Sequence, residues 1–232
     1  MKILNIYSDI IYTFFPNLCL ACDKKVKSKS SYFCISCSVE LPYSDHFEIK
    51  DHFLTRHFYG RIPFSFVGSL FIFREGSAIQ SMLHRLKYKK KSEVGTIMGE
   101  LLAQRANDCS FFPKPDIIIP VPIHFSKMFH RGYNQSTLIA APLAYKFGIP
   151  LHTDLLLKQK ITASQTRKSR SERIDNVAEN FIIHDPNQLL KGKHILLVDD
   201  VITTGATIES CAQVLLASGI QSLSILSAAA AE

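Results

Sequence analysis

Two neighbouring aspartates and the threonine-rich turn that follows them are the residues whose types and spacing best suit chemistry. Residues 195–207 read ILLVDDVITTGAT, so the acidic pair follows an apolar run. A glycine-containing turn between a strand and a helix offers free backbone N–H groups, which bind phosphate. We therefore expect a phosphate cradle made by Thr203, Thr204, Gly205, Ala206 and Thr207.

Asp199 and Asp200 need a different partner, because carboxylates repel a phosphate. Carboxylates accept hydrogen bonds from sugar hydroxyls and also bind Mg²⁺. The pair and the turn together therefore indicate a ribose phosphate as the ligand. The alternative is that an aspartate caps the helix that follows. Neither GxxxxGK[ST] nor GxGxxG after a strand occurs in the chain, which argues against the usual nucleotide-binding loops.

Four cysteines near the N-terminus form a second group with a recognisable chemistry. Two CxxC pairs are separated by eleven residues, and their members are Cys19, Cys22, Cys34 and Cys37. Two such pairs suit tetrahedral binding of one Zn²⁺, and a site with four cysteine ligands is closed and therefore structural. Two disulfides or free thiols are the alternatives. Cys109 and Cys211 stand apart and are expected to be packing residues.

The rest of the chain predicts the elements that must position these residues. Strands alternating with helices predict an α/β fold whose mostly parallel sheet is covered by helices on both faces. Asn134 suits the start of one helix and Gly148 its end, although Pro142 should kink it. Residues 42–63 show little periodicity and are expected to be a connector. Strands are expected over residues 67–73, 116–122, 194–198 and 220–228, and helices over 77–91, 94–105, 134–148 and 206–219.

The composition is that of an ordinary globular protein, with 232 residues, 47% hydrophobic and 20% charged. The net charge of +7 is uneven, because residues 85–91 hold five Lys or Arg and residues 158–173 hold six. Such runs suit a polyanion, and the alternative is a solvated surface. The first run supplies the candidate nucleic-acid residues Lys87, Tyr88, Lys89, Lys90 and Lys91.

The first nineteen residues are apolar, but Asp9 and Pro16 interrupt them and no small-residue cleavage site follows. They predict a short amphipathic helix instead of a signal peptide or a transmembrane segment, and we expect a cytoplasmic protein. We expect residues 1–55 to form this helix and the zinc module. Residues 56–232 are expected to form the α/β domain.

The segment VDDVITTGAT resembles the 5-phosphoribosyl-1-pyrophosphate (PRPP) signature of type I phosphoribosyltransferases. The four-cysteine N-terminus, LKYKKK, PVPIHFSKMFHRGYNQ and QTRKSRSERIDNVAENF extend the likeness. Together they resemble the ComF (competence protein F) family over nearly the whole chain. The resemblance implies a type I phosphoribosyltransferase-like sheet with a small N-terminal zinc module.

The resemblance also implies roles for individual residues. Asp199 and Asp200 would contact the ribose, and residues 203–207 would bind its 5-phosphate. Pro122, Ile123 and His124 would lie near the pyrophosphate, where Arg131 would neutralise charge. Residues 165–173 would form a mobile flap over the site.

One position departs from part of the wider superfamily. Purine-salvage members commonly carry an acid where this chain has Thr203, so Thr203 argues against a 6-oxopurine acceptor. Thr203 resembles the orotate and amido-transfer members instead, although no glutamine-hydrolysing domain is present.

The resemblance implies a phosphoribosyltransferase that uses PRPP with Mg²⁺ and releases pyrophosphate, in a protein with a role in natural transformation. The alternative is a non-catalytic, PRPP-regulated factor that binds single-stranded DNA and works with other competence proteins. A basic run that contains an aromatic ring is compatible with this alternative, because phosphates pair with cations and bases stack on rings.

Overall fold

The computed structural model describes residues 17–26, 31–159 and 181–232. The expected helix before Pro16 and the expected flap over residues 165–173 lie outside these ranges. Among the described residues, no helix combines the length and the apolar character that crossing a membrane requires.

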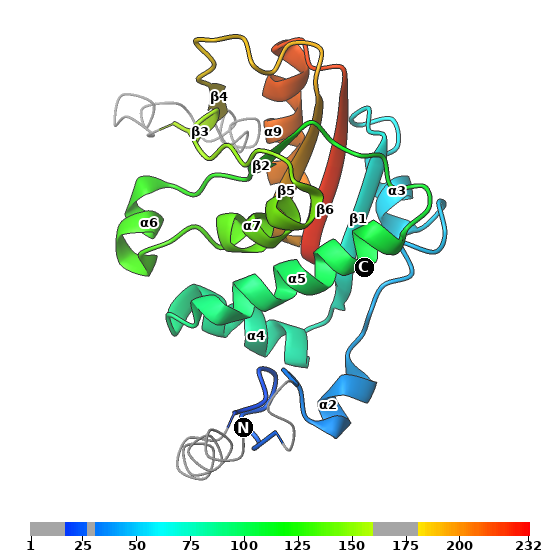
Figure 1. Ribbon diagram of the computed structural model, residues 1–232, viewed down its shortest axis with the longest axis vertical. Coiled ribbons are helices and arrows are strands. Elements are labelled where there is room, and N and C mark those ends of the chain that lie inside the picture. The colour runs from blue at the N-terminus through cyan, green and yellow to red at the C-terminus, as the bar shows by residue number, and fades with distance from the viewer. Residues whose placement is uncertain (1–16, 27–30, 160–180) are drawn as a thin grey trace, which may run out of the picture.

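Four parallel strands form the central sheet, which confirms the expected α/β class (Figure 1). Their order is β1-β6-β5-β2, so β5, which carries the acidic pair, has a neighbour on each side. The strands are β1 (Phe66–Phe73), β2 (Ile117–Pro120), β5 (His194–Ile202) and β6 (Ser222–Ala231). β5 is longer than expected, and Asp199 and Asp200 therefore lie inside it. A separate antiparallel pair consists of β3 (Leu156–Lys158) and β4 (Phe181–Ile183).

Helices pack on both faces of this sheet because alternate side chains of β5 point to opposite sides. Leu196 and Val198 join the core formed with α4 (Ala78–Tyr88), α5 (Ser92–Asp108) and α7 (Gln135–Phe147). Ile195 and Leu197 join the core formed with α9 (Ala206–Ala217) and α3 (Phe53–Phe58). Two further short helices are α2 (Ile35–Glu40) and α6 (Phe125–Arg131). These two layers fix both ends of β5.

The helix signals of the sequence are used as expected. Ser77 accepts a hydrogen bond from the Gln80 backbone at the start of α4, and Asn134 caps α7 in the same way. Gly148 ends α7 in a left-handed conformation, with φ of 63°. The helix continues through Pro142, whose Cγ would lie 2.9 Å from a Cβ placed on Gly99 of α5. A glycine at this position therefore lets α5 and α7 approach closely.

The stretch 42–63, expected to be a connector, contains structure that its weak periodicity did not indicate. α3 buries Leu54 and Phe58, and a helix of only six residues is too short to show a periodic pattern. Earlier in the stretch, Tyr43 makes an antiparallel bridge to Phe71 at the edge of β1. The boundary expected between residues 55 and 56 falls within α3, and the division into two domains stays a prediction.

Candidate functional site

The acidic pair lies at the carboxyl end of β5, and both side chains are almost fully buried. Asp199 Oδ1 accepts hydrogen bonds from the Ser136 hydroxyl at 3.0 Å and from the Asp200 backbone N–H at 2.8 Å. Asp200 Oδ2 lies 2.8 Å from the Lys87 ammonium nitrogen. Helices α7 and α4 therefore each provide one partner for the pair.

Burial and a neighbouring charge shift the pKa of Asp199. Burial, and then the charge of Asp200, raise the pKa of Asp199 to about 7. Hydrogen bonds from the Asp200 backbone and Ser136, and the charge of Lys87, oppose this shift only in part. Two carboxylates held side by side in a buried site favour a bound cation or hydroxyl donors.

The turn after β5 has the geometry of an anion-binding loop. Gly205 adopts φ of 75° and is the residue that precedes α9, a helix of 12 residues. Thr203 and Thr204 are exposed, and Thr207 borders a hollow that it shares with the acidic pair. No side chain caps α9, so the structure does not support the alternative that an aspartate caps this helix. The first N–H groups of a helix have no partner within it, and phosphate binds favourably at such a helix end.

A hollow of about 160 Å³ lies over the acidic pair. The loop after β2 lines it with Pro122, Ile123 and His124, three residues that the resemblance places near pyrophosphate. Four cationic side chains also line it, and these are Lys87, Lys127, Arg131 and Lys158. The carboxylates are thus outnumbered by cations, which suits a ligand with several negative charges.

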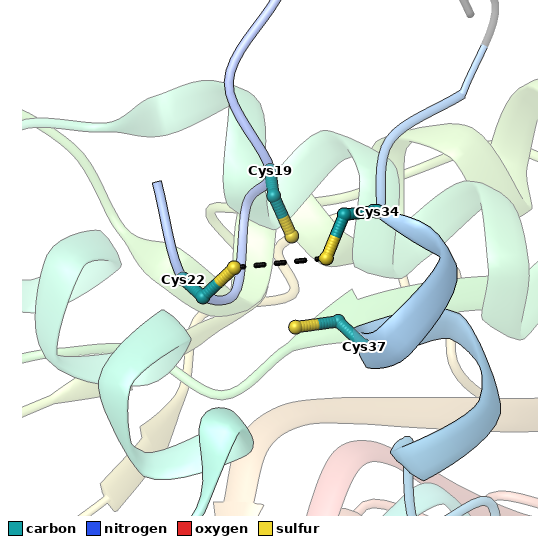
Figure 2. A group of neighbouring side chains, drawn as sticks. All are labelled: Cys19, Cys22, Cys34 and Cys37. Carbon is teal, nitrogen blue, oxygen red and sulfur yellow. Dashed lines mark hydrogen bonds between the residues drawn. The ribbon is translucent and has the colours of Figure 1, made fainter. Parts of the chain in front are cut away.

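The four N-terminal cysteines converge on one point, as expected for a metal site. Figure 2 shows their sulfur atoms directed toward one another from two separate segments of chain. All four sulfurs lie within 4.8 Å of one another, and Cys22 Sγ is 3.7 Å from Cys34 Sγ. Zn–S bonds of about 2.3 Å in a tetrahedron require sulfurs about 3.8 Å apart. The arrangement therefore fits one Zn²⁺.

The pKa values of these thiols shift in different directions. Burial opposes ionisation of Cys19, but backbone N–H groups of Cys34, Cys22 and Ala21 lower the pKa of its thiol to about 7. Burial and the neighbouring cysteines raise the pKa of the Cys37 thiol. The six cysteines all lie in the described ranges and are free, so the disulfide alternative has no support.

The profile of the phosphoribosyl transferase domain family matches residues 84–231, which include the acidic pair, the turn and the lining of the hollow. The chain belongs to this family. The matched region starts within α4 and ends within β6, so it covers the parallel sheet except for β1.

Three relatives extend the similarity of this phosphoribosyl transferase domain protein. The DNA utilization protein YhgH of Salmonella typhi is 33% identical over 62% of this chain and 63% of its own length. Competence protein F of Haemophilus influenzae is 26% identical over 90% of this chain and 88% of its own. Competence protein ComFC of Bacillus subtilis is 26% identical over 87% of this chain and 79% of its own. The chain thus spans about 63% of the first relative's length.

The phosphoribosyl transferase domain brings some candidate residues together and separates others. Arg131 reaches the hollow at the end of α6 and donates a hydrogen bond to Gln135 Oε1 at 2.8 Å. Lys87 also faces the hollow, whereas Lys89, Lys90 and Lys91 are exposed beyond the end of α4. The basic run is therefore divided between two surfaces.

The sequence did not reveal the residues that contact the loop of residues 203–207 from α3 and the segment after it. His57 Nε2 lies 3.1 Å from the Thr204 carbonyl oxygen, and Arg61 lies 2.8 Å from the same histidine nitrogen. Arg61 also pairs with Glu209 of α9 at 2.6 Å. His57 and Arg61 come from the stretch of residues 42–63, which was expected to be a connector. Their residue types were the only feature of the sequence that could have indicated a role at the site.

The Gly205→Ala variant is expected to destabilise the protein and displace the loop. A Cβ at Gly205 would lie 2.7 Å from Phe58 Cε1 and 2.8 Å from His57 Nε2, in addition to the strain of a positive φ. Such crowding costs about 1–3 kcal/mol, to be measured by denaturant unfolding. Gly60→Ala is the matched control, because Gly60 has the same φ of 75° with no atom within 4 Å. Equal losses in the two variants would contradict this account.

The Asp199→Asn variant is expected to stabilise the unliganded protein at pH 8. The pKa of Asp199 is about 7 in the folded protein instead of 3.8. Between pH 3.8 and about pH 7, the folded protein therefore binds a proton that the unfolded chain does not bind. The free energy of unfolding of the native sequence therefore falls as the pH rises through this window. The uncharged amide of the Asp199→Asn variant would avoid this loss of stability, and its oxygen would still accept the hydrogen bond from the Ser136 hydroxyl.

Thermal unfolding at pH 4.5 and pH 8 checks this expectation. At pH 8 we expect the Tm of Asp199→Asn to exceed that of the native protein by about 4 °C or more. Each kcal/mol of unfolding free energy moves Tm by about 2–4 °C in a chain of this size. The difference should shrink at pH 4.5. Asp51→Asn, at a carboxylate whose side chain is 83% exposed, serves as the control. A pH-independent difference would show that ionisation of Asp199 is not the cause.

Proposed function

We propose that this protein binds PRPP and transfers its phosphoribosyl group to a nitrogen nucleophile with release of pyrophosphate. The observation that carries the proposal is the shared hollow, which is lined by the buried acidic pair, by Thr207 in the first turn of α9 and by several cations. PRPP has a 5-phosphate, ribose hydroxyls and a diphosphate, and each group finds a complementary surface there. Membership of the phosphoribosyl transferase domain family supports the same ligand.

In this proposal the loop of residues 203–207 holds the 5-phosphate, and Asp199 and Asp200 accept hydrogen bonds from the ribose hydroxyls. Lys127, Arg131 and Lys158 face the diphosphate and stabilise negative charge as it leaves. The reaction needs no nucleophilic side chain, because the acceptor nitrogen attacks ribose C1 directly. The chain's contribution is therefore orientation and charge stabilisation.

Mg²⁺ fits this hollow, because Asp199 and Asp200 offer the oxygen ligands that the ion prefers together with substrate phosphates. These two carboxylates would hold it. When bound, Mg²⁺ supplies charge neutralisation to the departing diphosphate.

Calorimetric titration of the purified chain with PRPP, with and without Mg²⁺, tests the proposal. We expect saturable binding that Mg²⁺ strengthens, and weaker binding of ribose 5-phosphate, which lacks the diphosphate. Absence of both heat and a thermal shift with PRPP would overturn the proposal. Release of pyrophosphate on adding candidate nitrogen acceptors would then separate an enzyme from a binding protein.

A second candidate function is handling of single-stranded DNA, and a strip of rings and cations favours it. Phe129 and Tyr88 are 78% and 64% exposed, and Arg131 lies 5.5 Å from the Tyr88 ring centroid. The centroid of the His84 ring lies 5.0 Å from the centroid of the same ring. Bases stack on exposed rings while cations pair with phosphates. The names of the relatives, DNA utilization protein and competence protein, agree with this candidate.

Salt-dependent binding of a fluorescent oligonucleotide tests this second function. A variant with Lys89, Lys90 and Lys91 replaced by Ala should lose affinity and show a shallower salt dependence. Replacement of the exposed Lys114, Lys191 and Lys193 by Ala is the matched control, because it removes the same number of charges elsewhere. Equal losses in both variants would indicate only non-specific attraction to a basic protein.

A further inference from the structure

Lys87 is fixed by its neighbours on α4 more firmly than a lysine in a basic run usually is. Leu86 is fully buried, and its carbonyl oxygen accepts a hydrogen bond from the Tyr133 hydroxyl at 2.7 Å. Arg85 donates to the Leu20 carbonyl oxygen and pairs with Asp23 at 2.6 Å. The last turn of α4 is therefore held on two sides, and the Lys87 side chain starts from a fixed backbone.

The Lys87 ammonium group is held close to the acidic pair. Its Nζ lies 2.8 Å from Asp200 Oδ2, and the two side chains are only 23% and 12% exposed. A partly buried pair of this kind is screened less by water and salt than an exposed one. In contrast, Lys89 is exposed just past the end of the helix. The contact with Asp200 therefore distinguishes Lys87 from the rest of the basic run.

An ammonium group has three N–H donors, and Asp200 Oδ2 uses one of them. Lys87 also lines the hollow that Lys127, Arg131 and Lys158 make cationic. Its remaining donors are thus available to an anionic ligand in that hollow. A single lysine can then contact a carboxylate and a phosphate oxygen at once.

We propose that Lys87 is a ligand-positioning residue that bridges Asp200 and the diphosphate of PRPP. This inference rests on the proposed function and adds a role that the sequence did not assign to Lys87. Through this bridge, Lys87 fixes the position of the Asp200 carboxylate relative to the diphosphate. Asp200 binds the ribose, and the diphosphate is the group that leaves ribose C1. Lys87 acts as a donor at both contacts and transfers no proton.

Titration of the Lys87→Met variant with two ligands tests the bridge. Methionine keeps much of the length of the side chain and removes the charge, so packing changes little. We expect the affinity for PRPP to fall about tenfold or more, since hydrogen bonds to charged groups are strong. The affinity for ribose 5-phosphate, which lacks the diphosphate, should fall less than about threefold. Lys191→Met, at an exposed lysine outside the hollow, is the matched control and should bind both ligands like the native protein.

The outcomes separate the bridge from a structural role. Equal losses for PRPP and ribose 5-phosphate would show that Lys87 only orders Asp200, and would overturn the proposal. Unchanged affinity for PRPP would overturn it as well. Thermal unfolding of each variant is measured alongside, and if Lys87→Met fails to fold, Lys87→Arg keeps the charge on a differently shaped group. Lys87→Arg should then change the ratio of the PRPP and ribose 5-phosphate affinities.

Inorganic pyrophosphate distinguishes failure of this proposal from failure of the proposed function. If the native protein binds PRPP but Lys87→Met binds it equally well, only the bridge is wrong. If the native protein does not bind PRPP but binds pyrophosphate, and Lys87→Met binds pyrophosphate more weakly, Lys87 contacts the diphosphate and the proposed PRPP function is wrong. If the native protein binds neither compound, both proposals are overturned.

Discussion

The Asp200→Asn variant is expected to lose most of its affinity for PRPP, to about one-tenth or less of the native value. Asp200 is buried and carries one of the two carboxylates in the hollow, which we propose to bind the ribose hydroxyls. Hydrogen bonds to a charged acceptor contribute about 1.5–3 kcal/mol, and an amide oxygen replaces them poorly. The substitution also removes the charge that faces Lys87 at 2.8 Å. Calorimetric titration with PRPP and Mg²⁺ measures the effect.

The control for this variant is Asp51→Asn, which makes the same chemical change at a side chain that is 83% exposed. We expect that variant to bind PRPP normally. Thermal unfolding of both variants shows whether they remain folded. A folded Asp200→Asn protein with native affinity would contradict the assignment of this carboxylate to the ribose.

The Cys34→Ser and Cys37→Ser variants are each expected to lose bound zinc and to unfold at a lower temperature. One hydroxyl in place of a thiolate leaves three ligands, and structural zinc contributes directly to folding free energy. The cysteine cluster shares a core with α4 and α5, because Cys19, Ala21 and Val26 are buried in it. Loss of the metal should therefore also weaken the packing of α4 and α5. Elemental analysis of purified protein measures the metal content, expected at one zinc per native chain.

Cys109→Ala is the control for zinc loss, because Cys109 is buried outside the cluster. It should reduce stability by leaving a small cavity and still retain zinc. Retention of zinc in both serine variants would contradict a four-cysteine site. Loss of zinc in Cys109→Ala as well would show that the metal content follows general stability.

The sequence predicted the parts of this protein that depend on local pattern. The buried strand over 194–198, the turn TTGAT and the capping residues Ser77 and Asn134 each follow from residue type and spacing within a few positions. The paired CxxC motifs belong to the same class, since the ligands within each pair are close in sequence. Such signals need no knowledge of the tertiary fold.

The residues that the sequence did not place are those that meet through tertiary packing. His57 reaches the Thr204 carbonyl across 147 positions of sequence, and Ser136 reaches Asp199 across 63. Lys87 looked like its basic neighbours in the sequence because its contact with Asp200 forms only in the folded protein. No periodic pattern encodes such contacts, and the six-residue α3 was too short to be recognised.

The last turn of α4 joins two parts of the protein that the sequence keeps far apart. Arg85 contacts the first cysteine pair through Leu20 and Asp23, and two residues later Lys87 contacts Asp200. Figure 1 shows α4 between the N-terminal cysteine segment and α5. We expect such a shared support to link the binding free energies of the metal and the sugar phosphate, and such linkage is reciprocal. The sugar phosphate should then raise the affinity of the chain for the metal, and a chain stripped of its metal should bind the sugar phosphate more weakly.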